Sequence, residues 1–524
     1  MAKARQAWGT RIGIIMAVAG SAIGLGNFLR FPVQAASNGG GAFLIPYFIS
    51  LFLLGIPLMW VEWTLGRYGG GYGHGTAPGI FHTMWEKNRF IKYFGVIGIF
   101  GPLVIFIYYT YVESWTLAYS FFALTGKYAG AAASAETGMR SFLSAFQGLE
   151  KNNYFSSFVP SYTFFLITFF ANIAVIYYGI KGGIEKLCKI AMPLLFIFGV
   201  AIMIRVFTLG APDPARPEWN IANGLGFMWN PDFSVLASAK VWLAAAGQIF
   251  FTLSVGIGVI LTYASYLSKG DDVVLSGISA VSMNEVAEVI IGGSIVIPAA
   301  FIFFGPDSIQ AIAKGGAFNL GFVTMPLVFE KVFMGAFFGF IWFLLLFLAG
   351  ITSSVSLAQP AVAFLEDEFG INRPKSVFIF GAVSFILCQP AVFLLGKGIV
   401  NELDFWGGTF CLVLFATVEI ILFAWIFGMD RAWAEIHHGA DMKLPIAYKF
   451  IIKFVTPVFL LLILGFWLYQ DGIETILMKN VSAADRPFIL ATRAFLVFIF
   501  VAIAVMVKVA WRRSSGRARR TVKI

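Results

Sequence analysis

The chain has 524 residues, of which 59% are hydrophobic and only 12% are charged, and its mean hydropathy is +0.83. That composition excludes a soluble globular protein. The net charge of +10 does not indicate nucleic acid binding, because most Lys and Arg residues lie in segments that we expect on the cytoplasmic side of a membrane. The sequence therefore predicts an all-α polytopic membrane protein that is surrounded by membrane lipid.

Apolar runs long enough to cross a bilayer recur along the whole chain. The excess of Lys and Arg on one side of the membrane predicts an orientation of these spans with both termini in the cytoplasm. The basic tail at 511–524 suits contact with lipid headgroups. We expect a multi-pass protein of the cell inner (plasma) membrane. The twelve predicted transmembrane helices cover residues 11–36, 41–66, 93–124, 162–180, 187–208, 240–267, 275–305, 335–365, 375–396, 405–428, 449–469 and 487–510.

The first span is interrupted near the bilayer midplane by the stretch 20–30, GSAIGLGNFLR. Each glycine costs about 1 kcal/mol relative to alanine in a helix, and irregular backbone at membrane depth survives only when it is buried in protein or lines a wet cavity. Close helix packing also favours small residues, but it does not require Asn27 or the nearby Arg30. We therefore predict a polar binding site here.

The sixth span has a matching interruption in the stretch 248–258, QIFFTLSVGIG. The two interruptions lie five spans apart, so the two halves of the chain insert with opposite orientation. Corresponding broken helices in two inverted halves are a strong sequence sign of a transporter's binding site.

Further polar groups fall at the same depth in other spans: Tyr109, Asn284 and the run 349–354, AGITSS. Their oxygens suit hard cations, while free N–H groups at a helix break attract anions. A zwitterion bound with small cations fits such a site. The sequence contains no evident nucleophile–base pair or metal-ligand cluster, so we do not expect an enzyme. A cation channel or a ligand-sensing membrane protein is the alternative from another class.

Five carboxyls fall inside predicted spans: Glu62, Glu113, Glu285, Glu288 and Glu419. Intramembrane carboxyls are rare and functional by default. The alternative is a structural, hydrogen-bonded acid, and for Glu62 and Glu419 the sequence favours neither. Two long external segments, 125–160 and 306–334, complete the predicted topology, and the second is either a lid or a plain surface loop.

Short motifs spread over the whole chain carry a family resemblance. They are GxxxGLGNFLRFP at 20–32, NGGGAF at 38–43, GIP at 55–57, FTLS at 251–254, TYASY at 262–266 and AGITSS at 349–354. Together they resemble the neurotransmitter:sodium symporter family, and most closely its bacterial leucine transporter type. The resemblance implies a 5+5 inverted repeat with unwound first and sixth helices. Its expected parts are a cytoplasmic gate segment (1–10), two repeats (11–208 and 240–428), helices eleven and twelve (449–510) and the basic tail (511–524).

The resemblance also implies two sodium sites and one amino-acid site. The first sodium site would comprise Ala22, Asn27, Thr252, Asn284 and the substrate carboxylate. The second would comprise Gly20, Ile23, Ala349, Thr352 and Ser353. The implied substrate-binding residues are Ser21, Ala22, Leu25, Gly26, Ile105, Tyr109, Phe251, Thr252, Ser254, Ile257, Ser353 and Leu357.

Two gates follow from the same resemblance. The outer gate would be Arg30 with Asp404, above Tyr109 and Phe251. The inner gate would be Arg5 with Asp367, supported by Trp8, Ser265 and Tyr266.

Two positions depart from the pattern of other members in an informative way. Glu288 stands where chloride-dependent members have a neutral serine, so its carboxylate implies chloride-independent transport. Gly24 stands where amine carriers have an acid, so the substrate is expected to bring its own carboxylate.

These features predict a sodium-coupled symporter that imports neutral, hydrophobic L-amino acids by alternating access. The pocket residues do not choose among individual amino acids, since one methylene discriminates by only about 1–3 kcal/mol. A proton-coupled amino-acid carrier is the nearest alternative, and the retained Thr352 and Ser353 favour sodium. The sequence leaves the oligomeric state open.

Overall fold

The computed structural model describes residues 6–306, 309, 315–479 and 481–521, and within these ranges it is built of helices without a β-strand. The helices of the first half are α1 Arg11–Ala22, α2 Leu25–Ser37, α3 Leu44–Ser50, α4 Ile56–Gly70, α5 Ala77–Met84, α6 Ile91–Phe94, α7 Ile97–Thr125, α8 Ala129–Ala133, α9 Ala135–Phe146, α10 Val159–Tyr177, α11 Lys186–Phe207 and α12 Ile221–Trp229.

The second half has the same character. Its helices are α13 Ala239–Leu253, α14 Val259–Ala264, α15 Val274–Glu285, α16 Gly293–Phe304, α18 Gly316–Asn319, α19 Met325–Glu330, α20 Gly335–Phe369, α21 Arg373–Phe393, α22 Ile399–Leu403, α23 Cys411–Ile421, α24 Met429–Ile436, α25 Ala447–Phe450, α26 Thr456–Trp467, α27 Ile473–Ile476 and α28 Arg486–Thr521.

Short π-helical segments join several of these helices into longer rods. They are η2 Leu51–Gly55, η3 Ile180–Glu185, η5 Val286–Gly292, η6 Leu320–Thr324, η8 Asp404–Phe410, η9 Leu422–Ile426, η10 Ile451–Val455 and η11 Leu468–Gly472. Three 3₁₀ turns, η1 Gly41–Phe43, η4 Phe233–Ala237 and η7 Leu395–Lys397, complete the described elements.

In the described ranges, ten helices are long and apolar enough to cross a membrane, and the bent pair α1–α2 makes an eleventh. The predicted sixth span is divided between α13 and α14, so neither part reaches full length by itself. The all-α, multi-span prediction is thus confirmed, and the other span limits agree with the helices to within about two turns.

Both predicted breaks are present. After α1, Ile23 is extended (ψ 93°), and α2 continues at an angle of 47° to α1. After α13 the backbone turns left-handed at Ser254 (φ 53°), Gly256 (φ 75°) and Gly258 (φ 90°). A side chain at Gly256 would lie 2.4 Å from the Leu412 carbonyl oxygen, so both the positive φ and the close approach require glycine there.

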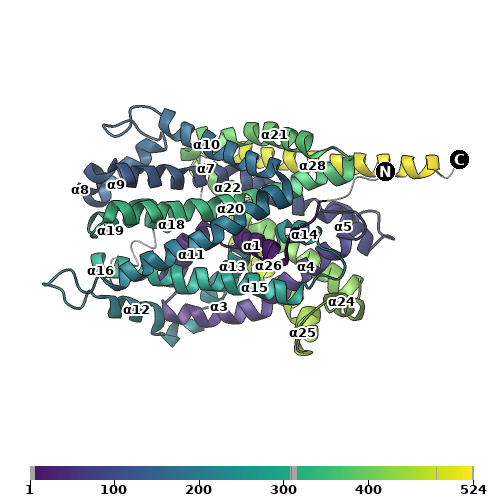
Figure 1. Ribbon diagram of the computed structural model, residues 1–524, viewed down its shortest axis with the longest axis horizontal. Helices are drawn as coiled ribbons and strands as arrows, with labels where there is room; N and C mark the ends of the chain where they lie inside the picture. Colours follow the sequence, from purple (N-terminus) through teal and green to yellow (C-terminus); the bar gives the residue numbers. More distant parts are fainter. Residues whose placement is uncertain (1–5, 307–308, 310–314, 480, 522–524) are drawn as a thin grey trace.

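The long helices α7 and α20 pack along each other through the middle of the molecule (Figure 1). The short helices α8, α9, α18 and α19 lie at one end of the bundle, and α5, α24 and the end of α28 lie at the other. The first end carries the predicted external segments and the second the predicted cytoplasmic ones.

The second long external segment folds back onto the bundle. Its helix α18 packs against α2, and the rings of Phe318 and Phe322 contact Trp115 of α7 at centroid distances of 5.5 and 5.8 Å. The part of this segment in the described ranges is therefore packed against the protein, over the outer end of the broken first span.

Candidate functional site

A cluster of oxygen-bearing side chains joins the two broken helices to α15. Asn27 Nδ2 donates to Thr252 Oγ1 at 3.1 Å and to Asn284 Oδ1 at 2.8 Å. The Asn27 Oδ1 atom accepts from Gly24 N–H at 2.9 Å, which caps the first turn of α2. All three side chains are buried. The structure thus brings together the side chains of the predicted first sodium site, and this oxygen-rich donor set fits a hard cation.

The residues of the predicted second sodium site meet where α1 packs against α20. Ser353 Oγ lies 3.3 Å from the Gly20 carbonyl oxygen and 3.0 Å from that of Ala349, and Thr352 Oγ1 lies 3.2 Å from the same Ala349 oxygen. The Ala349 carbonyl oxygen therefore lies within 3.2 Å of both hydroxyls, and the Ser353 hydroxyl connects it to α1. Ile23, the remaining member, is the extended residue directly after α1.

A small cavity of about 50 Å³ lies between the two helix breaks. At one edge, Leu25 N–H at the start of α2 donates to Tyr109 Oη at 3.2 Å, and Ser254 Oγ donates to the Ser21 carbonyl oxygen at 2.9 Å. Ten of the predicted substrate-binding residues line it, namely Ser21, Ala22, Gly26, Ile105, Tyr109, Phe251, Ser254, Ile257, Ser353 and Leu357. The other two, Leu25 and Thr252, do not line it.

The sequence analysis missed several lining residues. Tyr108, Ser356, Gly408 and Leu412 also border the cavity, and Ser356 Oγ lies 2.7 Å from Ser21 Oγ. Helical spacing is a signal that could have found Ser356, because it falls three residues after the predicted Ser353 on the same helix. No local pattern marks Gly408 or Leu412.

The predicted outer gate residues border a second cavity directly outside the first. It measures about 190 Å³, and Arg30, Tyr109, Phe251 and Asp404 lie along its wall. The Arg30 guanidinium carbon is 4.2 Å from the centroid of the Phe251 ring, and Asp404 Oδ1 accepts from Tyr108 Oη at 2.5 Å. Arg30 and Asp404 therefore share a cavity but have other partners, and they do not form an ion pair within 4 Å.

At the predicted cytoplasmic side, Trp8 packs against α14. Trp8 Nε1 donates to the Tyr263 carbonyl oxygen at 2.9 Å, and the two rings pack edge to face at 5.3 Å. Ser265 Oγ donates to the Thr262 carbonyl, and Tyr266 Oη accepts from Gln359. Asp367 lies near the end of α20. Arg5 lies outside the described residues, so the predicted Arg5–Asp367 contact stays a prediction.

Glu288 lies directly behind the first cluster. Its Oε1 accepts from Gln248 Nε2 at 2.9 Å and from Tyr47 Oη at 3.1 Å, and its Oε2 accepts from Thr252 Oγ1. The carboxyl is fully buried, and it shares Thr252 with the predicted first sodium site. A negative charge at this position would stabilise a nearby cation. Tyr47 and Gln248 are partners that the sequence analysis did not identify.

Two of the other buried carboxyls, Glu62 and Glu113, have hydrogen-bond partners. Glu62 accepts from Gly256 N–H and lies within electrostatic range of the buried Glu419, so Glu62 supports the broken part of the sixth span. Glu113 accepts from Asn172 Nδ2 at 3.2 Å, and Asn172 in turn accepts from Ser354 at 2.5 Å, next to the Thr352–Ser353 pair. These contacts favour a structural role for Glu62.

The sequence also matches known proteins over most of its length. The family model described as the sodium:neurotransmitter symporter family matches residues 5–211 and 165–511. The sodium-dependent transporter MJ1319 of Methanocaldococcus jannaschii is 30% identical over 461 residues, which are 87% of this chain and 89% of the relative. The sodium-dependent transporter YhdH of Bacillus subtilis is 29% identical over 473 residues, which are 87% of this chain and 96% of the relative.

A solved structure has the same fold. The crystal structure of MhsT in complex with L-phenylalanine superposes with a TM-score of 0.73 at 29% sequence identity, over 88% of this chain and 99% of MhsT. The broken first and sixth spans, the oxygen cluster between them and the sequence matches lead to one assignment. The chain belongs to the sodium:neurotransmitter symporter family of membrane transporters.

Proposed function

We propose that this transporter couples the inward movement of sodium to the import of neutral, hydrophobic L-amino acids, without chloride. The observation that carries the proposal is the contact between the Asn27–Thr252–Asn284 cluster and the small cavity, because Asn27 borders both. Sodium and substrate are both cargo, and in this proposal they bind next to each other. If a substrate carboxylate touches the sodium ion, each stabilises the binding of the other, and thermodynamic linkage makes the effect reciprocal.

The two ends of the cavity support an amino-acid substrate. The start of α2 points Leu25 N–H toward Tyr109 Oη, and a helix N-terminus of this kind favours a carboxylate. Ile105, Phe251 and Ile257 make much of the remaining wall apolar. An apolar wall favours a hydrophobic side chain, and MhsT, which has the same fold, is in complex with L-phenylalanine.

Alternating access gives the two gates their roles. The proposed cycle moves parts of the two repeats, residues 11–208 and 240–428, relative to each other within the inner membrane, with both termini in the cytoplasm. In this structure Trp8 packs against Tyr263 on the cytoplasmic side, while Arg30 and Asp404 stand apart around a cavity of about 190 Å³ on the other side. This arrangement supports a state whose inner gate is closed.

The proposal is tested by uptake into proteoliposomes with a panel of labelled amino acids, with and without an inward sodium gradient. We expect saturable uptake of large neutral amino acids that requires the sodium gradient and shows counterflow. The absence of a sodium effect on every substrate, with uptake driven by a proton gradient, would favour the proton-coupled alternative. Flux that neither saturates nor shows counterflow would favour a channel.

Chloride independence is tested in the same vesicles. Because the Glu288 carboxylate already supplies a negative charge beside Thr252, we expect equal uptake in chloride and in gluconate. A strong requirement for chloride would contradict this part of the proposal.

A further inference from the structure

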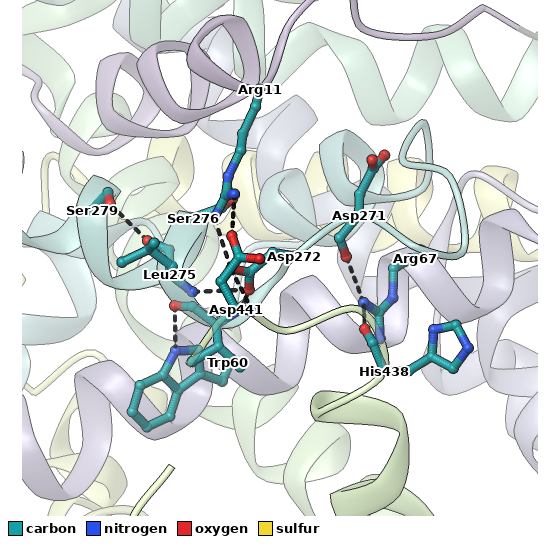
Figure 2. Close-up of polar contacts among 11 residues, drawn as sticks. Arg11, Trp60, Arg67, Asp271, Asp272, Leu275, Ser276, Ser279, His438 and Asp441 are labelled. Carbon is teal, nitrogen blue, oxygen red and sulfur yellow. Dashed lines mark hydrogen bonds and ion pairs between the residues drawn. The ribbon is translucent and has the colours of Figure 1, made fainter. Parts of the chain in front are cut away.

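Arg11, in the first turn of α1, holds two cytoplasmic loops at once (Figure 2). Its Nη2 atom donates to Asp272 Oδ2 at 2.7 Å, its Nη1 atom donates to Asp441 Oδ2 at 2.5 Å, and its Nε atom donates to Ser276 Oγ at 3.2 Å. Asp272 belongs to the loop between α14 and α15, and Asp441 belongs to the loop between α24 and α25. The first span is thereby attached to two separate parts of the second half of the chain.

The two loops are also fastened to each other without Arg11. Arg67 of α4, whose side chain is fully buried, donates from Nη1 to the carbonyl oxygens of Asp271 and His438, both at 2.6 Å (Figure 2). The backbones also touch, because a side chain at Gly439 would lie 2.3 Å from the Gly270 carbonyl oxygen. The loops therefore form one fixed platform, which we call the loop platform (residues 268–273 and 437–441).

One of the two carboxylates on the loop platform, Asp272, is held in place by contacts that do not involve Arg11. Asp272 Oδ1 accepts from Val274 N–H at 2.7 Å and from Leu275 N–H at 3.1 Å, so this side chain caps the start of α15. The Asp272 side chain is only 2% exposed, whereas those of Arg11 and Asp441 are 43% and 59% exposed. The hydrogen bond and the charge of Arg11 hold the pKa of Asp441 below its usual range.

Water has room to replace these contacts. A polar cavity of about 340 Å³ lies beside them, lined among others by Trp8, Thr10, Arg11, Asp272 and Asp441. The Arg11–Asp441 ion pair, in which both side chains are exposed, is weak, since water and salt screen it. The Arg11 contacts are therefore strong enough to bias a conformational equilibrium and weak enough to open repeatedly. Arg67, in contrast, has buried donors with fixed backbone partners and stays attached.

We propose that Arg11, Asp272 and Asp441 form a second cytoplasmic gate, in addition to the one at Trp8, which must open before α1, the first part of the broken first span, can leave the loop platform and release cargo. In this gate Arg11 moves with α1. Asp272, at the start of α15, is its first anchor, and Asp441, on the other loop, is its second. The inference rests on the alternating-access part of the proposed function. It names gating residues for that cycle and leaves the binding site unchanged.

The native Cys188 provides a reporter for this movement. It lies on α11 and is fully buried, and a side chain at Gly20 of α1 would come within 3.5 Å of its Sγ atom. When α1 moves away from α11, this thiol becomes accessible to a maleimide. Replacing Cys388 and Cys411 with alanine leaves Cys188 as the single thiol, because the chain has three cysteines.

The experiment measures the rate of Cys188 alkylation in the full chain in nanodiscs, in potassium buffer without sodium or substrate. Asp441→Ala is expected to raise the rate about two- to five-fold, the range for loss of an exposed ion pair. The matched control is Asp430→Ala, which removes another exposed cytoplasmic carboxylate, one paired with Lys449 at 2.7 Å and not with α1. The control is expected to leave the rate unchanged.

A double-mutant comparison separates the gate from a general loosening of the loops. Arg11→Ala is expected to raise the rate, and adding Asp441→Ala to it is expected to have little further effect. Equal rates for the wild type, Asp441→Ala and Asp430→Ala would overturn the proposal, and so would fully additive effects of Arg11→Ala and Asp441→Ala. Because the readout uses neither amino acid nor sodium, failure of the proposed transport function would not imitate either result.

Discussion

At the scale of single residues, two glycines of the first break are required by their neighbours. A side chain at Gly26 would lie 2.4 Å from Phe251 Cε1, and one at Gly24 would lie 3.0 Å from both Tyr109 Oη and Ser353 Oγ. The sequence marked these glycines as helix breakers. The structure adds that they make room for the rings and hydroxyls around the cavity.

Gly26→Ala is therefore expected to abolish most uptake while leaving the protein folded. The new methyl group must displace the Phe251 ring, which borders both the cavity and the Arg30 guanidinium. We expect uptake to fall by at least about tenfold, the factor for 1.4 kcal/mol, with little change in melting temperature. The control is Gly247→Ala on α13, where a side chain would meet open space. Equal uptake by the two variants would contradict the prediction.

A second prediction at the residue scale concerns Glu288 and the sodium dependence of uptake. Its carboxylate shares Thr252 with the predicted first sodium site, so Glu288→Gln removes a negative charge beside the bound cation while keeping the shape of the side chain. We expect the sodium concentration for half-maximal uptake to rise on the order of tenfold. Glu330→Gln, at the external end of α19, is the control. An unchanged sodium dependence in Glu288→Gln would remove this role.

At the scale of elements, the end of α28 docks on the cytoplasmic segment around α5. The Trp511 ring stacks on His74 at a centroid distance of 6.0 Å and meets the edge of His82 at 5.7 Å, and Lys92 Nζ lies 5.6 Å from the same ring. His74 also bonds Glu368 of α20 at 2.7 Å. This packing joins three elements that the sequence places far apart.

Docking of α28 is expected to weaken in acid. Burial, with the charges of Lys92 and His74, lowers the pKa of His82 below the usual histidine value of about 6.5, against the weaker opposing effects of Glu86 and Glu368. The folded protein then binds fewer protons than the unfolded chain, so stability rises with pH and is lost as pH falls below about 6.5. Between pH 7.5 and 5.5 the melting temperature of the wild type should fall more than that of His82→Gln. Parallel curves would contradict the assignment.

At the scale of the whole molecule, bound sodium would join elements that otherwise meet only through side-chain contacts. The predicted first site links α2, α13 and α15, and the second links α1 and α20. A ligand that binds only the folded state stabilises it by about 2.7 kcal/mol when its concentration is 100 times its Kd.

Replacing the potassium in the buffer with sodium should therefore raise the melting temperature by several degrees, and the rise should grow with sodium concentration. Thr352→Val is expected to remove part of this rise, because it deletes one hydroxyl of the second site. Thr125→Val, at the exposed end of α7, should keep all of it. A melting temperature that does not respond to sodium would contradict the proposed coupling.

The sequence by itself determined the spans, the two breaks and the family. These features are local: a run of apolar residues predicts a span, and glycines with a polar residue inside such a run predict a break. The predicted oxygen ligands were named from the family resemblance; most of them lie in or beside the breaks or in the motif at 349–354, whereas Asn284 lies in the seventh predicted span. The positions of Gly20–Ser21 and Thr252–Ser254 in their motifs were enough to assign them to one site.

Only the tertiary structure decided which distant side chains meet. These contacts join residues that are more than 30 positions apart in the sequence. They include the contacts of Tyr47 and Gln248 with Glu288, of Ser356 with Ser21, and of Arg11 with two loops. The structure also separated Arg30 from Asp404. The physical reason is that such contacts depend on how whole helices cross and rotate, and side-chain spacing along one helix does not determine its orientation against another.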